Sequence, residues 1–170
     1  VVQLDKIDRS SGSLKKLREG LGDSASASGT DIANTTKAAF LALSSGVKNT
    51  DLEGFLRDTS KAAVGGFADL TDVVNVGTSA LDSYRAQGLK LTKALDTMFM
   101  ASKFGKLEFK DLAQSLGPLL PVAASAGVSF QEAAAGVAAL TRAGFDTPTA
   151  VTSLRGALVQ VYKPTTEATE

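Results

Sequence analysis

The stretch from Gly127 to Ala150, GVSFQEAAAGVAALTRAGFDTPTA, contains one complete helix together with its start and end signals. Ser129 and Glu132 have the spacing of a capping box, in which side chains and backbone satisfy each other's free groups at a helix start. Glycine followed by an apolar residue, here Gly144-Phe145, is typical of a helix end, because glycine adopts the left-handed conformation at little cost. Between these signals the apolar residues recur at helical spacing: Phe130, Ala133, Ala134, Val137 and Leu140. The stretch therefore predicts an α-helix with defined boundaries.

The same end signal recurs along the chain, at intervals of roughly 17 to 22 residues. The predicted helix ends are Gly46, Gly66, Gly88, Gly105, Gly127 and Gly144. Start signals follow several of them: Thr50 with Glu53 has capping-box spacing, and Thr147 before Pro148 is typical of an N-cap with proline at the first helical position. The agreement of end and start signals predicts short helices separated by tight turns.

Helical apolar spacing fills the segments between these signals, beginning with the stretches Ile32–Leu43 and Leu52–Ala63. We expect about seven helices of three to four turns between Asp31 and Lys163, and no alternating pattern persists long enough to predict a strand. The fold class is all-α. Because the helices differ in sequence and follow no strict numerical repeat, the expected arrangement is an irregular array and not a solenoid.

The two ends of the chain differ in composition from this helical part. Residues 1 to 30 are rich in serine and glycine and are linker-like, with a short amphipathic helix expected at Leu14–Leu21. Residues 164–170 are expected to be a connector, which leaves 31–163 as the helical domain. Since the chain begins with Val1 and shows no signal segment, we expect it to be a piece of a longer protein.

Residue composition excludes several classes of chemistry. The chain has no cysteine and no histidine, so disulfides, zinc sites with those ligands and serine–histidine triads are absent. The carboxylate pairs Asp69/Asp72 and Asp51/Glu53 have the residue types for acid–base catalysis, but both lie at predicted helix starts, where acidic groups interact favourably with the helix dipole. No phosphate-loop or dinucleotide pattern occurs. We predict that the protein is not an enzyme and has no cofactor or metal.

The balance of charge bears on nucleic-acid binding. The chain carries 18 basic and 18 acidic residues, whereas proteins that bind duplexes usually show a basic excess. The densest basic cluster, Lys15, Lys16 and Arg18, is followed by Glu19 and is best interpreted as a solvated helix face. We expect no sequence-specific nucleic-acid binding.

The stretch Leu112–Thr141 contains a single charged residue, Glu132. One interpretation is a buried helix pair packed through alanines. The other is a membrane-active hairpin, because Leu112–Gln131 is uncharged over the length that a bilayer span needs. Polar residues, two prolines and the Ser129 capping signal favour the buried pair.

Within this stretch Pro118 and Pro121 must kink or restart the helix, because proline lacks an amide hydrogen and clashes with the preceding turn. They are candidates for a bend around the core or for a hinge. The apolar residues around them form a candidate helix-packing or partner surface: Leu112, Leu116, Leu119, Leu120 and Ala123.

The order of several segments resembles the tape measure family, the minor tail proteins of long-tailed phages. The residues that carry the resemblance are Thr71–Asn75, Leu81–Tyr84, Ala94–Phe99 with Gly105, Leu112–Gly117, Pro121–Ala123, Ala126–Ser129, Ala138–Gly144 and Ala150–Arg155. The likeness covers about three quarters of the chain and does not include residues 1 to 30.

The resemblance implies a structural protein of the virion tail, in the tube lumen or at the tip, assembled in the host cytoplasm. It implies a role in tail assembly, tail length determination and DNA ejection. The implied partners are other copies of the chain, tail tube proteins, tail-tip or baseplate proteins, and tail assembly chaperones.

The frequent glycine ends distinguish this chain from a measuring rod, since long rods sustain apolar heptads without interruption. We therefore expect a folded domain attached to the rod, acting through helix–helix contacts. The alternative is a membrane-engaging domain that uses Leu112–Leu140 to help penetrate the host envelope.

Overall fold

A computed structural model of the chain describes Gly22 and residues 32–162. The predicted Leu14–Leu21 helix, the basic cluster and the connector at 164–170 lie outside the described residues. The described part is helical and contains no strand, so the all-α prediction is confirmed.

Within the described residues there are eight α-helices and two short 3-10 helices. The α-helices are α2 (Ile32–Ser44), α3 (Leu52–Gly65), α4 (Leu70–Ser83), α5 (Leu91–Phe104), α6 (Phe109–Ser115), α7 (Leu120–Ser125), α8 (Phe130–Arg142) and α9 (Thr147–Tyr162). The 3-10 helices are η2 (Arg85–Gln87) and η3 (Gly117–Leu119).

The one helix beyond the predicted seven comes from the break between α6 and α7. Pro118 lies in η3, and Pro121 occupies the first turn of α7, where a missing amide hydrogen costs nothing. The helix therefore restarts at this point, as the two prolines predict.

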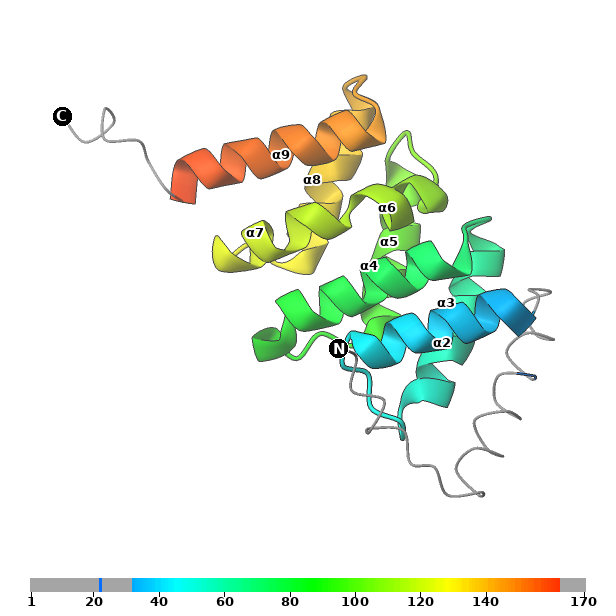
Figure 1. Cartoon of the computed structure of the whole chain (residues 1–170). Helices are drawn as coiled ribbons and strands as arrows, with labels where there is room; N and C mark the ends of the chain where they lie inside the picture. Colours follow the sequence, from blue (N-terminus) through cyan, green and yellow to red (C-terminus); the bar gives the residue numbers. More distant parts are fainter. Residues whose placement is uncertain (1–21, 23–31, 163–170) are drawn as a thin grey trace.

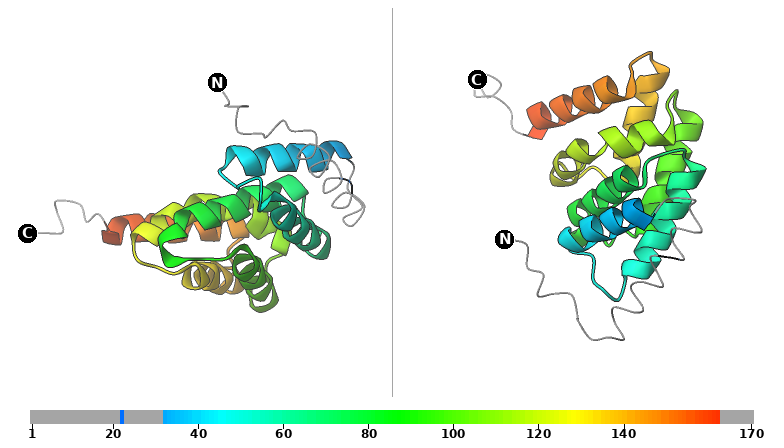
Figure 2. Two further views of the ribbon diagram at one scale, coloured as in Figure 1. Left: turned by 90° about the horizontal axis from the view of Figure 1, so that it is seen from below. Right: turned by 45° about the vertical axis from the view of Figure 1, so that its right-hand side comes forward.

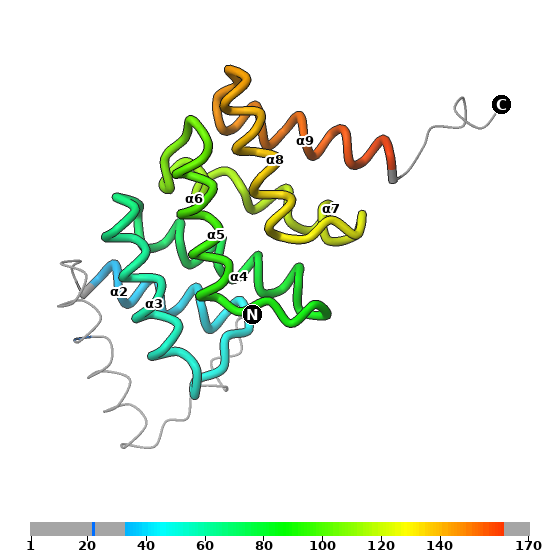
Figure 3. Tube along the Cα trace, turned by 180° about the vertical axis from the view of Figure 1, so that it is seen from behind, coloured from blue at the N-terminus to red at the C-terminus, as the bar shows by residue number. Residues whose placement is uncertain are grey.

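The helices form two layers (Figure 1). In the first layer α2, α4, the α6–η3–α7 segment and α9 lie side by side and run in the same direction. In the second layer α3, α5 and α8 run back across them (Figures 2 and 3). A first-layer helix and the second-layer helix that follows it form a pair. Each described helix packs mainly against helices of its own pair or of an adjacent pair, so the fold is quasi-one-dimensional.

This arrangement has a regular period that the sequence analysis did not recognise. First-layer helices begin at Ile32, Leu70, Phe109 and Thr147, and second-layer helices begin at Leu52, Leu91 and Phe130. In both layers successive starts are about 39 residues apart, a period within the range of helical-repeat arrays. The array is therefore more ordered than the differing helix sequences indicate.

The core lies between the two layers and consists mainly of alanine, leucine and valine. Tyr84 at the end of α4 is one of its largest members. Its hydroxyl donates a hydrogen bond to the carbonyl of Val128 at 3.1 Å, and its ring meets Phe130 edge-on at 5.8 Å. These contacts join the first-layer helix α4 to the start of the second-layer helix α8.

Four of the six predicted glycine ends have the expected left-handed backbone: Gly46, Gly88, Gly127 and Gly144, with φ of 93°, 68°, 75° and 109°. After Gly127, for example, the amide of Val128 donates to the carbonyl of Ala123, a bond that closes the helix end. At these positions the predicted reason for glycine is confirmed.

At Gly66 and Gly105 that reason is wrong, because both have negative φ. What requires glycine here is space. A Cβ on Gly66 would lie 2.1 Å from Cδ1 of Phe109, and one on Gly105 would lie 3.0 Å from the Thr141 hydroxyl oxygen. Each glycine thus allows one helix pair to approach the next closely.

The helix starts agree with the sequence analysis only in part. The capping box of Ser129 and Glu132 is confirmed. The box predicted for Thr50 and Glu53 is wrong, because Asp51 precedes α3 and the Thr50 hydroxyl donates to the Asp51 carboxylate instead.

Two further starts were not anticipated. At α9 the cap lies one residue earlier than predicted, since the Asp146 carboxylate accepts the amide of Thr149 at 2.8 Å. At α6, Glu108 and Asp111 form a reciprocal capping box.

We predict that Gly66→Ala is more destabilising than Gly127→Ala. The first adds a methyl group against the buried Phe109 ring, which itself stacks on Phe99, so overpacking of about 2–3 kcal/mol is expected. The second has open space and costs only about 1 kcal/mol for its left-handed backbone. Urea denaturation of the two variants measures the difference, and an equal or reversed order would contradict the packing account.

We predict that Ser60→Ala stabilises the protein by about 1 kcal/mol, because the Ser60 hydroxyl is buried and has no hydrogen-bond partner among the described residues. The neighbouring Thr59→Val is the matched control. Its hydroxyl donates to the Phe55 carbonyl at 2.9 Å, so its removal is expected to give no gain. A lower melting temperature for Ser60→Ala than for the wild type would refute this.

Candidate functional site

The predicted packing or partner surface in α6 to α7 lies in the core. Its five residues, Leu112, Leu116, Leu119, Leu120 and Ala123, each have an exposed fraction of 0%. They hold the first layer onto its neighbours and leave no accessible apolar surface for a partner. Pro118 and Pro121 are exposed at the junction of α6, η3 and α7, and a hinge there stays a prediction.

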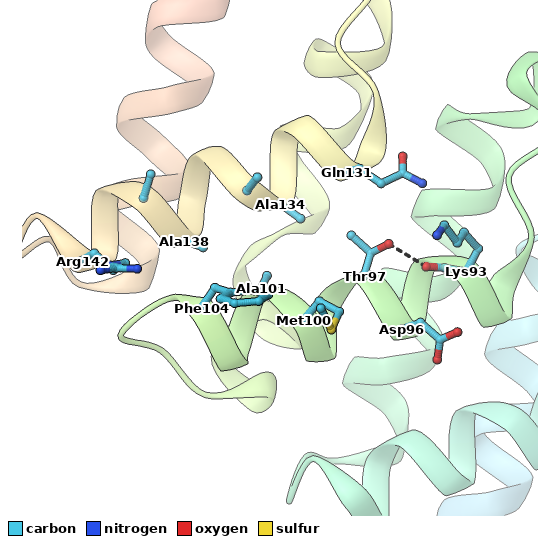
Figure 4. Close-up of a pocket in the computed structure, with 12 residues that line it drawn as sticks. Lys93, Asp96, Thr97, Met100, Ala101, Phe104, Gln131, Ala134, Ala138 and Arg142 are labelled. Atoms are coloured by element: carbon cyan, nitrogen blue, oxygen red, sulfur yellow. Dashed lines mark hydrogen bonds between the residues drawn. The ribbon is translucent and has the colours of Figure 1, made fainter.

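An accessible apolar groove lies elsewhere, between the parallel second-layer helices α5 and α8 (Figure 4). Its volume is about 510 Å³. Ala101, Ala134 and Ala138 line it and are themselves buried, while Met100 and Phe104 on α5 are about half exposed. A half-exposed aromatic ring beside a floor of alanines is typical of a contact surface for another apolar group.

The groove exists because of side-chain size at two positions of the repeat. Ala134 and Ala138 on α8 stand one repeat after Leu95 and Phe99 on α5. In the preceding pair of second-layer helices, Phe99 fills the space beside α3: it lies within contact distance of Gly65 and stacks on Phe109 at 4.2 Å. The two alanines leave space between α5 and α8, where Phe104 stands at the repeat position that Gly65 has on α3.

Charged groups stand at both ends of the groove. Lys93 and Asp96 lie at the end where the two helices begin, and Arg142 lies at the other end near Phe104 (Figure 4). Among the described residues no carboxylate is within ion-pair distance of Arg142. The groove therefore has an apolar centre, a basic and an acidic group at one end, and a basic group at the other.

A second exposed apolar feature lies at the end of α3. Phe67 has an exposed fraction of 90% and a left-handed φ of 50°, a conformation that costs a bulky residue about 1–2 kcal/mol. The amide of Ala68 closes the helix end on the Ala63 carbonyl, which places Phe67 and not Gly66 at the left-handed position. Val64, one turn earlier, is half exposed beside it. We call Val64 and Phe67 the apolar tip.

The carboxylates considered for catalysis act as structural groups. Asp69 caps α4, and its pKa is lowered mainly by the hydrogen bond from the Thr71 hydroxyl. Asp72 accepts a hydrogen bond from Gln114 at 3.0 Å, so it joins α4 to α6. Within the residues that the structure describes, no cluster of three potential metal ligands occurs.

The membrane interpretation of Leu112–Leu140 gains no support from the structure. In the described part of the chain, no helix combines the length and the apolar character of a bilayer span. The stretch is divided among α6, η3, α7 and α8, and its large apolar side chains are in the core.

Fold and site together define a class: an all-helical array whose accessible features are apolar contact surfaces. The family described as phage-related minor tail protein matches residues 15–170. The chain is also 33% identical over 139 residues to the tape measure protein of Pneumococcus phage Dp-1, an alignment that covers 76% of this chain and 12% of that protein. The chain belongs to the phage-related minor tail protein family, structural components of the phage tail, which confirms the tape measure resemblance. No solved structure matches the chain.

We predict that acid destabilises the helix caps. The pKa of Glu132 is lowered, chiefly by the Ser129 hydroxyl, so its contribution to stability is present at neutral pH and is lost as the pH falls below about 4. Glu132→Gln should therefore melt at a lower temperature than the wild type at pH 7, and the two should converge near pH 3. Thermal melts between pH 3 and pH 7 measure the difference in melting temperature between the variant and the wild type. Glu53→Gln, at a helix start without a side-chain cap, is the control, and a gap for Glu132→Gln that is independent of pH would contradict the prediction.

Proposed function

We propose that this chain is a folded segment of a tape measure protein that acts in tail assembly by contact between helices and not by catalysis. The observation that carries the proposal is the exposed groove between α5 and α8, in a chain that belongs to a minor tail protein family. The groove and the apolar tip provide surfaces for partners, while carboxylates such as Asp69 and Glu132 serve as helix caps.

The folded array is poorly suited to serve as the measuring element itself. A continuous helix rises about 1.5 Å per residue, so one repeat of about 39 residues would span about 58 Å as a rod. Neighbouring packed helices lie only about 10 Å apart, and each repeat of the array advances by one such step. Per residue, the array therefore contributes roughly one sixth of the length of a rod, which supports a folded domain attached to the rod.

The proposed partners are other copies of the chain, tail tube proteins, tail-tip or baseplate proteins, and tail assembly chaperones. The proposed location is the tube lumen or the tail tip, after assembly in the host cytoplasm. Through its place in the longer protein, the segment takes part in tail length determination and in genome delivery through the tail. The similarity to a tape measure protein supports these roles, and the matched part is 12% of that relative.

We predict that deletion of residues 70–108 in the phage shortens the tail by about 10 Å or less. The deletion removes α4 and α5, one full repeat, and joins Asp69 to Phe109 so that α6 keeps an acidic N-cap. Tail length is measured by electron microscopy, with circular dichroism of the purified variant as the check on folding. A tail shortened by about 58 Å would show that the segment acts as an extended ruler.

A further inference from the structure

We propose that the groove between α5 and α8 receives the apolar tip, Val64 and Phe67, of a second copy of this chain. The inference rests on the proposed role in contacts between copies and assigns that contact to named surfaces. It begins from two complementary features of one molecule: a vacant apolar space, and an aromatic side chain that the fold holds out into solvent.

The groove is present because α8 carries small side chains where α5 carries large ones. Where α5 presents Leu95 and Phe99 to its neighbours, α8 presents Ala134 and Ala138 at the equivalent positions of the repeat. Phe99 is half buried between Gly65 and Phe109, so the fold already shows how an aromatic ring fills this position. A phenylalanine from another molecule would lie over Ala134 and Ala138 beside Phe104, in the space that larger side chains would fill.

Phe67 is suited to supply that ring. It has the greatest exposure among the large apolar residues that the structure describes, and its left-handed backbone keeps it at the very end of α3. The hydrogen bond from the Ala68 amide to the Ala63 carbonyl fixes this turn, so the ring is held in solvent by the helix end and not by contacts of its own.

Charged residues flank the tip, as they flank the groove. Lys61 lies one turn before Val64, and Asp69 follows Phe67 by two residues; both are exposed. With the tip in the groove, we orient the second copy so that its Asp69 faces Arg142, which has no carboxylate within ion-pair distance among the described residues; its Lys61 then faces the end that carries both Lys93 and Asp96. This pairing selects one orientation of the two copies.

Because the tip and the groove are different surfaces, the contact is heterologous. Each copy offers its tip to one neighbour and its groove to another, so copies add head to tail in a chain or a ring. A single tip buries little area, so the pairwise contact is expected to be weak in dilute solution and stronger where copies are held close together.

The test uses sedimentation velocity of the 170-residue chain and two variants. Phe67→Gly removes the ring and relieves the left-handed strain, so it is expected to fold. Ala139→Glu places a charged side chain across the groove at an exposed helical position beside Arg142, where glutamate retains a high helix propensity. Phe40→Ser is the matched control: an exposed phenylalanine on α2, outside both the tip and the groove.

The wild type and Phe40→Ser should show a sedimentation coefficient that rises with concentration, whereas each of the other two variants alone should associate at least about tenfold more weakly. An equimolar mixture of Phe67→Gly and Ala139→Glu should form a dimer and nothing larger, because one variant retains the groove and the other retains the tip.

Three results would overturn the proposal. If the wild type associates and both Phe67→Gly and Ala139→Glu associate equally well, copies meet through another surface, and the proposed role in contacts between copies stands. If only Ala139→Glu loses association, the groove holds a different segment. If the wild type is monomeric at every concentration, this contact is absent, and the role in the tail is then judged by the deletion of residues 70–108.

Discussion

The close approach of each helix pair to the next, at Gly66 and again at Gly105, is the constraint on which the array depends. Gly66 has no room for a methyl group beside Phe109, and Gly105 has none beside Thr141 and Ala138. These glycines lie one repeat apart, and each stands at the junction between a second-layer helix and the next first-layer helix. The partners differ, since Gly66 meets α6 of the first layer and Gly105 meets α8 of the second, but both contacts hold one helix pair close to the next. The third member of the series, Gly144, has open space and a left-handed φ instead, and it precedes the last described helix.

Much of the fold was accessible from the sequence, because helix ends and starts depend on local chemistry. Capping at Ser129, left-handed glycine at Gly127 and the restart at Pro118 each depend on a few neighbouring residues and were predicted. The role of Gly66 was not predicted, because its requirement comes from Phe109, which is separated from it in the sequence by the helices α4 and α5. The repeat was missed for a related reason: helix lengths and core positions recur about every 39 residues, whereas the identities of the residues at those positions change, as at Leu56, Leu95 and Ala134.

The candidate site was less predictable than the fold. The sequence drew attention to Leu112–Ala123 because that stretch is uncharged, and the structure shows that lack of charge there reflects complete burial of its leucines. The groove lies instead among alanines, which by themselves indicate only a helix. The groove can be inferred from the sequence only when residues one repeat apart are compared, because alanine on α8 occupies the positions of leucine and phenylalanine on α5. Phe67 could not have been found in this way, because its exposure follows from the turn geometry at the end of α3.

In a single long helix, the length spanned is proportional to the number of residues. In a repeat array with nearest-neighbour contacts, it is not. In a rod, each added residue lengthens the molecule by about 1.5 Å, and any insertion changes the length measured. In this array, residues 32–162 would span about 200 Å as one helix, yet the helices are stacked side by side at steps of about 10 Å. The residues of the segment thus add exposed surface and contribute little length. Since each pair depends mainly on its neighbours, the surface between α5 and α8 can differ from the one before it without disturbing the rest of the core. A change of side-chain size at two positions thus opens a groove between one pair of helices, while the packing of the other repeats is retained.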